Sequence, residues 1–319
     1  MSAAGVLRIG TRASALALWQ AREVASRIAA QPGAPVVELV HIHTSGDLQT
    51  EVPLWQTRGR AFFTREIDRA LLDGAVDVAV HSLKDLPTEL EAGLALAALL
   101  PRADPRDALL SRTGAGLAAL PAGARIGTSS LRRRAFIARL RPDAVLLELR
   151  GNVPTRVERL QRGDYDAIVL AAAGLTRLGL AQQVSEYLSP ESFPPAVSQG
   201  VIGVCARSGD ELTRRWLSAL DEPESRLAAS AERALLRHLE GGCQVPLGAL
   251  ATVQGGRLTL MARVCALDGT RHLSARSEAV AEPAEAEVLG VRVAEELLAS
   301  GAGELMQKER AARAAVEPP

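Results

Sequence analysis

Cys243 lies in a segment that combines a thiol with a glycine pair and a proline, Leu-Glu-Gly-Gly-Cys-Gln-Val-Pro-Leu-Gly. Residues 223–239 before it carry leucine and alanine at helical spacing. Gly241 and Gly242 then predict a helix end, because glycine accepts the left-handed backbone of a C-terminal cap. Cys243 is therefore expected at the apex of a loop, where a large group can reach the sulfur. The alternative is a buried cysteine that packs as a small hydrophobic residue.

Arginine side chains gather at three places where a predicted strand gives way to a predicted helix. The segments are Thr11-Arg12-Ala13-Ser14, Ser129-Ser130-Leu131-Arg132-Arg133, and Arg150-Gly151-Asn152 with Arg156. The N-terminus of a helix offers free backbone N–H groups and the positive end of its dipole, which favour an anion. Since guanidinium groups hold carboxylates bidentately, the repeat predicts a small ligand with several acid groups. The alternative at each junction is an arginine that is solvated or paired with a local acid.

The segment His81-Ser82-Leu83-Lys84-Asp85 follows an apolar run at residues 76–80 that is typical of a buried strand. Asp85 is therefore expected at the carboxyl end of a sheet, where an aspartate can move a proton or stabilise a developing cation. Lys84 is one of only two lysines among 37 basic residues, and its ammonium could pair with an acidic ligand. The alternative is a solvated turn ahead of Pro87.

Other candidate groups give weaker signals. His41 and His43 alternate on a predicted strand without a nearby carboxylate or cysteine, so no metal site is predicted. His238 precedes Cys243 closely in sequence, which leaves open a Cys–His catalytic pair, although such pairs usually join distant residues. Cys205 lies in an apolar run and is expected in the core, as is Cys265.

Composition narrows the class of protein. The chain has 319 residues, 47% of them hydrophobic, which suffices for two or three domains. No apolar run approaches the ~20 residues that span a bilayer, and residues 1–10 do not resemble a secretory signal. Three widely spaced cysteines argue against a disulfide framework and fit a reducing cytoplasm. The 37 basic residues are balanced by 37 acidic ones, which argues against nucleic acid as the main partner.

Alternating strands and helices are expected to position these groups. Strand-like runs in the first part are 6–10, 36–44 and 76–80, and those in the second are 124–127, 145–149 and 167–172, with helical patterns between them. Two such units predict an α/β fold with two lobes and mixed, largely parallel sheets. A helix, three strand-like runs and a final helix predict a smaller α+β domain. The predicted boundaries are residues 1–100 with 200–218, 106–195, and 223–319.

Taken together, these motifs resemble the porphobilinogen deaminase family, also called hydroxymethylbilane synthases, from residue 7 to about residue 304. The resemblance is carried by Arg8-Ile9-Gly10-Thr11-Arg12, Leu16-Ala17-Leu18-Trp19-Gln20, His81-Ser82-Leu83-Lys84-Asp85-Leu86-Pro87, Gly127-Thr128-Ser129-Ser130-Leu131-Arg132-Arg133, Leu149-Arg150-Gly151-Asn152-Val153 and residues 239–248. It implies two lobes like those of periplasmic binding proteins and a third domain that carries the cysteine loop. It also implies a cytoplasmic monomer that acts on a small molecule.

The resemblance implies a transferase that condenses four porphobilinogen molecules head to tail, with release of ammonia, to hydroxymethylbilane. The primer would be a dipyrromethane cofactor joined by a thioether to Cys243, and Asp85 would be catalytic. The residues implied to bind the cofactor are Ser14, Lys84, Thr128, Ser130, Arg132 and Arg133. The residues implied to bind substrate are Arg12, Gln20, Arg150, Arg156, Arg177 and Gln199.

Two departures from the family pattern and two rival functions stay open at this point. Arg60 and Ala61 replace a common lysine and glycine in a segment expected to act as a lid, which predicts a stiffer loop. Ser45 stands where a basic residue is common. The rivals are a binding protein that clamps a dicarboxylate without chemistry, and a cysteine hydrolase that uses Cys243.

Overall fold

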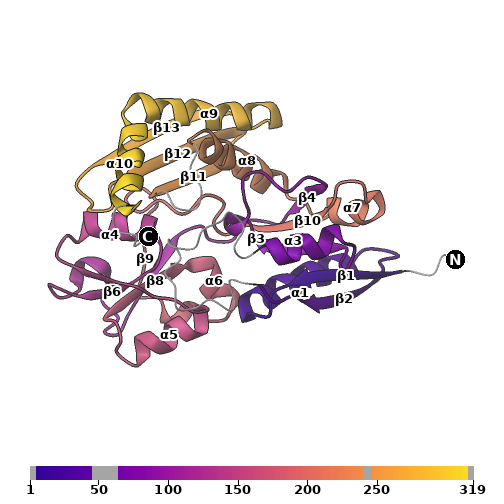
Figure 1. Cartoon of the computed structure of the whole chain (residues 1–319), viewed down its shortest axis with the longest axis horizontal. Coiled ribbons are helices and arrows are strands. Elements are labelled where there is room, and N and C mark those ends of the chain that lie inside the picture. The colour runs from indigo at the N-terminus through magenta and orange to yellow at the C-terminus, as the bar shows by residue number, and fades with distance from the viewer. Residues whose placement is uncertain (1–4, 45–63, 240–245, 315–319) are drawn as a thin grey trace. The chain divides into compact units, whose positions relative to one another are not determined.

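The computed structural model describes residues 5–44, 64–239 and 246–314 (Figure 1). Its contacts divide the chain into two compact units. The first unit holds the described residues up to 103 together with 200–226, and the second holds 104–199 and the described residues from 227 onward. The departures from the family pattern, Ser45 and the expected lid with Arg60 and Ala61, lie outside the described residues, as does Cys243.

The first unit is built on a mixed sheet. Its described strands, in spatial order, are β2 (Val36–His41), β1 (Val6–Thr11), β3 (Val78–Ser82), β10 (Ile202–Arg207) and β4 (Leu94–Leu99). β1 pairs in parallel with β2 and β3, whereas β10 runs antiparallel to β3 and β4. The carboxyl ends of β1 and β3 therefore lie side by side, and it is at these ends that parallel strands present ligand-binding groups.

Helices cover this sheet with apolar faces. They are α1 (Ala15–Ala29), α3 (Arg65–Leu72) and α7 (Glu211–Ser218). Val24 and Ile28 of α1 are fully buried in one cluster with Ile9 of β1. The first core therefore ties α1 to the strand that precedes it.

The second unit begins with another mixed sheet. Its described strands, in spatial order, are β7 (Val145–Leu147), β6 (Arg125–Gly127), β8 (Ala167–Ala171), β5 (Asp107–Ser111) and β9 (Glu186–Tyr187). β6 pairs in parallel with β7 and β8, and β5 runs antiparallel to β8 and β9. Its helices are α4 (Leu131–Leu140), α5 (Val153–Gln161) and α6 (Ala172–Arg177), and short 3-10 turns occur at Leu117–Ala119 and Ala181–Gln183. Phe136 of α4 packs against Phe193 in the core beneath, with ring centroids 5.6 Å apart.

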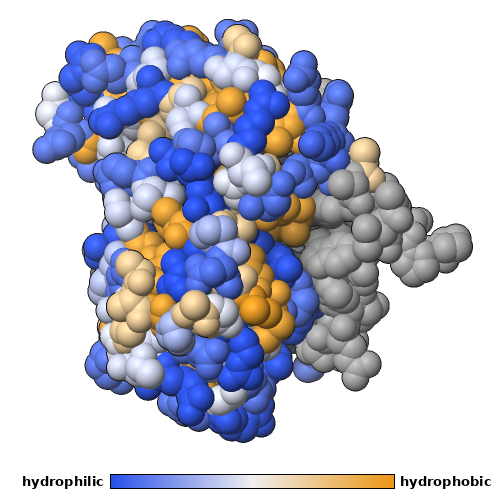
Figure 2. Space-filling view, turned by 90° about the vertical axis from the view of Figure 1, so that its left-hand side faces the viewer, coloured by the Kyte–Doolittle hydropathy of each residue, from blue (hydrophilic) through white to orange (hydrophobic). Residues whose placement is uncertain are grey.

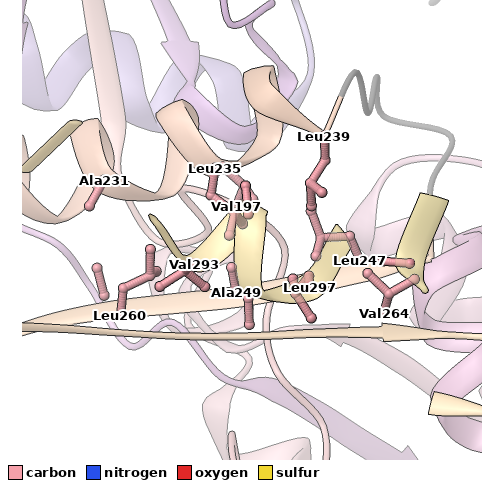
Figure 3. Close-up of a cluster of buried hydrophobic side chains, with 14 of the residues drawn as sticks. Val197, Ala231, Leu235, Leu239, Leu247, Ala249, Leu260, Val264, Val293 and Leu297 are labelled. Atoms are coloured by element: carbon pink, nitrogen blue, oxygen red, sulfur yellow. The ribbon is translucent and has the colours of Figure 1, made fainter. Parts of the chain in front are cut away.

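A three-stranded antiparallel sheet forms the rest of the second unit. Its strands are β11 (Leu247–Gln254), β12 (Arg257–Cys265) and β13 (His272–Val280), and its helices are α8 (Pro223–His238), α9 (Pro283–Ala299) and α10 (Ala302–Ala314). Figure 3 shows side chains of α8 and α9 meeting those of the sheet in a single core. Gly290 lets the two helices approach closely, because a Cβ there would lie 2.3 Å from the carbonyl oxygen of Ala231.

The α/β fold class with an α+β C-terminal part is confirmed, and the structure adds elements that the sequence patterns did not predict. These are β5, α7 and α10. Residues 94–99 form strand β4 at the sheet edge. The face in Figure 2 carries hydrophobic residues in small groups among hydrophilic ones. The division into three domains stays a prediction.

Candidate functional site

Ser14 ends the turn between β1 and α1, and Gln20 lies within α1. Ser14 is the N-cap of α1, and its hydroxyl accepts a hydrogen bond from the Ala17 backbone N–H at 3.4 Å. Gln20 is 2% exposed and donates from Nε2 to the Ser82 hydroxyl at 2.8 Å. A buried amide thus ties the first turns of α1 to the end of β3, which holds the two predicted binding segments of this unit together.

Lys84 and Asp85 lie in a single 3-10 turn, Leu83–Asp85, directly after β3. The leucines on either side, Leu83 and Leu86, are buried. The Leu83 N–H donates to the Val201 carbonyl oxygen at 3.0 Å, and the Leu86 N–H donates to the Leu83 carbonyl oxygen at 3.1 Å. Two apolar anchors therefore fix the turn and leave Lys84 and Asp85 half-buried at the carboxyl end of the sheet.

A buried histidine precedes this turn in β3 and lies close to a buried aspartate of α3. His81 of β3 and Asp68 of α3 are each 5% exposed, and Nε2 lies 3.6 Å from Oδ1 without a hydrogen bond. Burial, and then the charge of Arg12, lower the pKa of His81 to about 4. Burial raises the pKa of Asp68 to about 6, against a smaller opposing effect of Thr64. His81 is therefore neutral at pH 7.

The turn between β6 and α4 repeats the capping arrangement of the first unit. Ser130 is the N-cap of α4, and its hydroxyl accepts from the Arg133 backbone N–H at 3.4 Å. The buried Thr128 hydroxyl accepts from the Ser130 N–H at 3.2 Å. Ser129 donates to the Leu149 carbonyl oxygen at 2.6 Å and so joins the ends of β6 and β7. The hydroxyl groups of this turn thus hold the start of α4 in place.

Arg132 and Arg133 turn inward and meet a carboxylate that the sequence analysis did not select. Asp107 at the start of β5 is fully buried, and its oxygens lie 2.7 Å from Nη1 of Arg132 and 2.7 Å from Nη2 of Arg133. Gln199 donates from Nε2 to Asp107 at 3.1 Å. At this junction both arginines pair with an acid of the chain, and their predicted contact with a ligand stays a prediction. The apolar run Ala108-Leu109-Leu110 was the one sequence signal for a strand there.

The third junction places Arg150 and Arg156 on either side of a tight turn. Asn152 caps α5 by accepting from the Thr155 N–H at 3.0 Å, and Gly151 adopts φ 106°, which favours glycine. Arg156 donates from Nε to the Gly151 carbonyl oxygen at 2.7 Å. Burial lowers the pKa of Arg150, and Glu148 opposes that shift. Arg177, half-buried at the end of α6, lies on the element that follows β8.

The described residues on either side of the segment 240–245 pack in the core shown in Figure 3. Leu239, the last described residue before the loop, is 2% exposed, and Leu247, which begins β11, is 5% exposed. Both pack in the same cluster as Val197. The ends of the segment that carries Cys243 are therefore held in the core of the second unit.

These groups suit a ligand with several acid groups. In the first unit, Lys84 and the half-buried Asp85 share one turn after β3, and Arg12 follows the neighbouring strand β1. In the second unit, arginines follow each of the three parallel strands. Arg132 and Arg133 follow β6, Arg150 and Arg156 follow β7, and Arg177 ends α6, the helix after β8. Within the described residues, no cluster of three or more His, Cys, Asp or Glu side chains is arranged to hold a metal ion. No described helix has both the length and the apolar character to cross a membrane.

Comparisons with known proteins place these features in a family. Residues 7–215 match the family model "Porphobilinogen deaminase, dipyromethane cofactor binding domain", and residues 226–299 match "Porphobilinogen deaminase, C-terminal domain". Porphobilinogen deaminase of Geobacter metallireducens is 49% identical over 301 residues, covering 94% of this chain and 93% of that relative. The protein of the same name from Syntrophotalea carbinolica is 49% identical over 302 residues, covering 94% of this chain and 95% of that relative.

Among solved structures, the methionine-binding protein MetQ is similar at 12% identity and a TM-score of 0.44, over 67% of this chain and 89% of that chain. This likeness is distant, and the assignment rests on the sequence relatives. Two family models together match most of the chain, and both relatives are nearly half identical across almost its whole length. The chain therefore belongs to the porphobilinogen deaminase family.

Proposed function

We propose that this chain condenses four porphobilinogen molecules head to tail into hydroxymethylbilane, on a dipyrromethane joined to Cys243. The overall reaction balances when four substrates and one water yield the linear tetrapyrrole and four molecules of ammonia. The observation that carries the proposal is the match of residues 7–215 to a model named for dipyrromethane binding, together with the two relatives at 49% identity.

The donor set fits a dipyrromethane, which carries several carboxylates. Two buried guanidiniums share a single carboxylate at the head of α4, so this cluster has one positive charge in excess. We assign Arg132, Arg133, Thr128 and Ser130 in the second unit, and Ser14 and Lys84 in the first, to the cofactor. When bound, the cofactor supplies the pyrrole carbon to which the first substrate is joined.

Asp85 is assigned the catalytic role. The half-buried Asp85 carboxylate lies in one turn with Lys84, and it can stabilise the positive charge that develops on a substrate pyrrole as its amino group leaves. Because that charge is larger in the transition state than in bound substrate, the interaction accelerates the reaction and does not merely tighten binding. The Asp85 carboxylate can then accept the proton that the pyrrole nitrogen or carbon releases.

The remaining cationic groups are assigned to the acetate and propionate groups of the incoming substrate. These residues are Arg12, Gln20, Arg150, Arg156, Arg177 and Gln199. Gln20 and Gln199 are buried and spend amide donors on the protein, so we expect them to act mainly by holding neighbouring groups in place. We also propose a cytoplasmic monomer that binds neither membranes nor nucleic acid, in keeping with three widely spaced cysteines and balanced charge.

The function is tested by incubating the full chain with porphobilinogen and following substrate, ammonia and linear tetrapyrrole together. We expect four substrates consumed and four molecules of ammonia released per tetrapyrrole. A protein that only binds would leave porphobilinogen unchanged, and a cysteine hydrolase would instead release acid from ester or amide substrates. Either of those results would overturn the proposal.

A further inference from the structure

Asp107 gathers three side chains that were assigned separately to cofactor or substrate. Its Oδ1 accepts from Arg133 Nε at 3.0 Å, Arg133 Nη2 at 2.7 Å and Gln199 Nε2 at 3.1 Å. Its Oδ2 lies 2.7 Å from Arg132 Nη1. Asp107 is 0% exposed, so water does not screen these contacts.

The two arginines use their nitrogens differently. Arg133 directs all three inward, with Nε and Nη2 on Asp107 and Nη1 on the Val169 carbonyl oxygen at 2.9 Å. Arg132 makes its polar contacts within the described part of the chain through Nη1 alone, to Asp107 and to the Pro194 carbonyl oxygen at 2.7 Å. The Arg132 guanidinium carbon also lies 5.8 Å from the centre of the Phe193 ring. Arg133 is thus an anchor, whereas Arg132 keeps Nε and Nη2 for another acceptor.

The charge balance indicates what that acceptor is. Burial alone would raise the pKa of Asp107, but the charges of Arg132 and Arg133 outweigh it and hold this pKa far below its usual range. Asp107 is therefore ionised, and two guanidiniums with one carboxylate leave one buried positive charge. A buried charge is costly unless it is paired, and a ligand carboxylate at Arg132 would pair it.

We propose that Asp107 is the positioning residue of the cofactor site: it fixes Arg132, through one shared carboxylate with Arg133 and Gln199, in the orientation that receives a carboxylate of the dipyrromethane. The proposal rests on the proposed function. It assigns Asp107 no contact with the cofactor and no part in proton transfer. Its effect is to orient one guanidinium while cancelling only one of two positive charges.

The first test measures how much of each purified, full-length variant carries a mass addition of two pyrrole units, by intact-protein mass spectrometry. Asp107→Asn keeps the shape of the side chain and removes its charge, and we expect at least a tenfold fall in the modified fraction. Asp166→Asn is the matched control. Asp166 precedes β8 of the same sheet, is partly exposed, and pairs with Arg125 at the end of the strands that lies away from Asp107. The control should keep wild-type occupancy.

A second pair of variants separates orientation from charge balance and avoids two unpaired buried guanidiniums. Arg133→Gln alone keeps the Asp107–Arg132 pair, with no net charge in the cluster. Arg133→Gln combined with Asp107→Asn keeps Arg132 and restores the single positive charge, but removes its carboxylate partner. Orientation by Asp107 predicts higher occupancy in the single variant, whereas attraction by net charge predicts higher occupancy in the double variant. Circular dichroism and thermal unfolding identify the folded samples to be compared.

The outcomes distinguish this proposal from the proposed function. Wild-type protein that carries no two-pyrrole adduct would remove the function and this proposal together. Wild-type protein that carries the adduct, with folded Asp107→Asn equally occupied, would overturn the positioning role alone. Equal or higher occupancy in the double variant than in Arg133→Gln would overturn it as well.

Discussion

The two mixed sheets have the same kind of ion pair at the amino ends of their parallel strands. They hold different side chains at the carboxyl ends of those strands. In the first, Arg8 of β1 pairs with Asp77 just before β3, and in the second Arg125 of β6 pairs with Asp166 just before β8. The aspartate N–H donates to the arginine carbonyl oxygen in both sheets, at 2.8 and 2.9 Å. These pairs are partly exposed, and each joins the parallel neighbours of its sheet.

The carboxyl ends hold buried polar groups of different kinds. Behind the turn that carries Asp85, His81 and Asp68 are 3.6 Å apart, and the histidine is neutral at pH 7. Behind the turn that carries Arg132, a fully ionised Asp107 is shared by two guanidiniums. This difference supports the proposal that the first sheet carries the reacting carboxylate and the second binds an anion. A common scaffold therefore carries two tasks through a few buried side chains.

The largest effect is expected at the reacting carboxylate. Asp85→Ala should lower turnover of porphobilinogen by about 10³-fold or more, because no other described group in that turn can stabilise the developing charge. Thermal unfolding should change little, since the turn is anchored by Leu83 and Leu86. Glu89→Ala, at an exposed position four residues on, is the control and should retain full turnover. Asp85→Ala with near-normal rates would remove Asp85 from the mechanism.

The next effect compares two ion-paired aspartates of the second sheet, one at each end of β8. Asp107→Asn leaves two buried guanidiniums without a counter-charge and should lower the free energy of unfolding by about 3–5 kcal/mol. Asp166→Asn breaks a partly exposed pair and should cost about 0–1 kcal/mol. Chemical denaturation of both variants measures the difference. Equal losses would mean that burial of Asp107 does not set the energy of its cluster.

A smaller effect concerns the pH dependence of stability, which we place in the first sheet. The raised pKa of Asp68, about 6, gives stability that is lost as pH rises from about 4 through 6. The lowered pKa of His81, about 4, gives stability that is lost as pH falls from about 6.5 to 4. The two effects oppose each other in wild-type protein.

Single substitutions should expose each effect. Asp68→Asn leaves His81, so its unfolding free energy should fall on acidification from pH 6.5 to 4 by about 2 kcal/mol relative to wild type. His81→Gln should show the opposite slope. Asp107, whose pKa is lowered, should add no slope between pH 5 and 7. Parallel curves for Asp68→Asn and wild type would contradict the assignment of pH sensitivity to this pair.

The smallest effect is one that the two sheets should share. Ser14→Ala and Ser130→Ala each remove an N-cap hydroxyl that accepts from the third residue of its helix, and each should cost about 1 kcal/mol. Urea titrations would measure both losses. A loss confined to one of the two variants would show that the capping arrangements are not equivalent.

Much of this arrangement could be predicted from the sequence because apolar periodicity and glycine turns are local signals. They correctly placed the strands that end near Thr11, His81 and Thr128, and the helices that follow the first and the last of these strands. Strand β5 was not predicted, since its five residues directly follow the segment 101–105, whose two prolines are typical of a linker. Asp107 was missed for the same reason. Its partners lie 25 or more residues away, and only tertiary packing brings Arg132, Arg133 and Gln199 to one carboxylate.

The group on Cys243 is the central claim, and intact-protein mass spectrometry of purified wild-type and Cys243→Ser chains tests it most directly. The account predicts that wild-type protein is heavier than its sequence by two pyrrole units, and that Cys243→Ser has the mass of its sequence alone. An unmodified wild-type chain that still converts porphobilinogen at full rate would contradict the account.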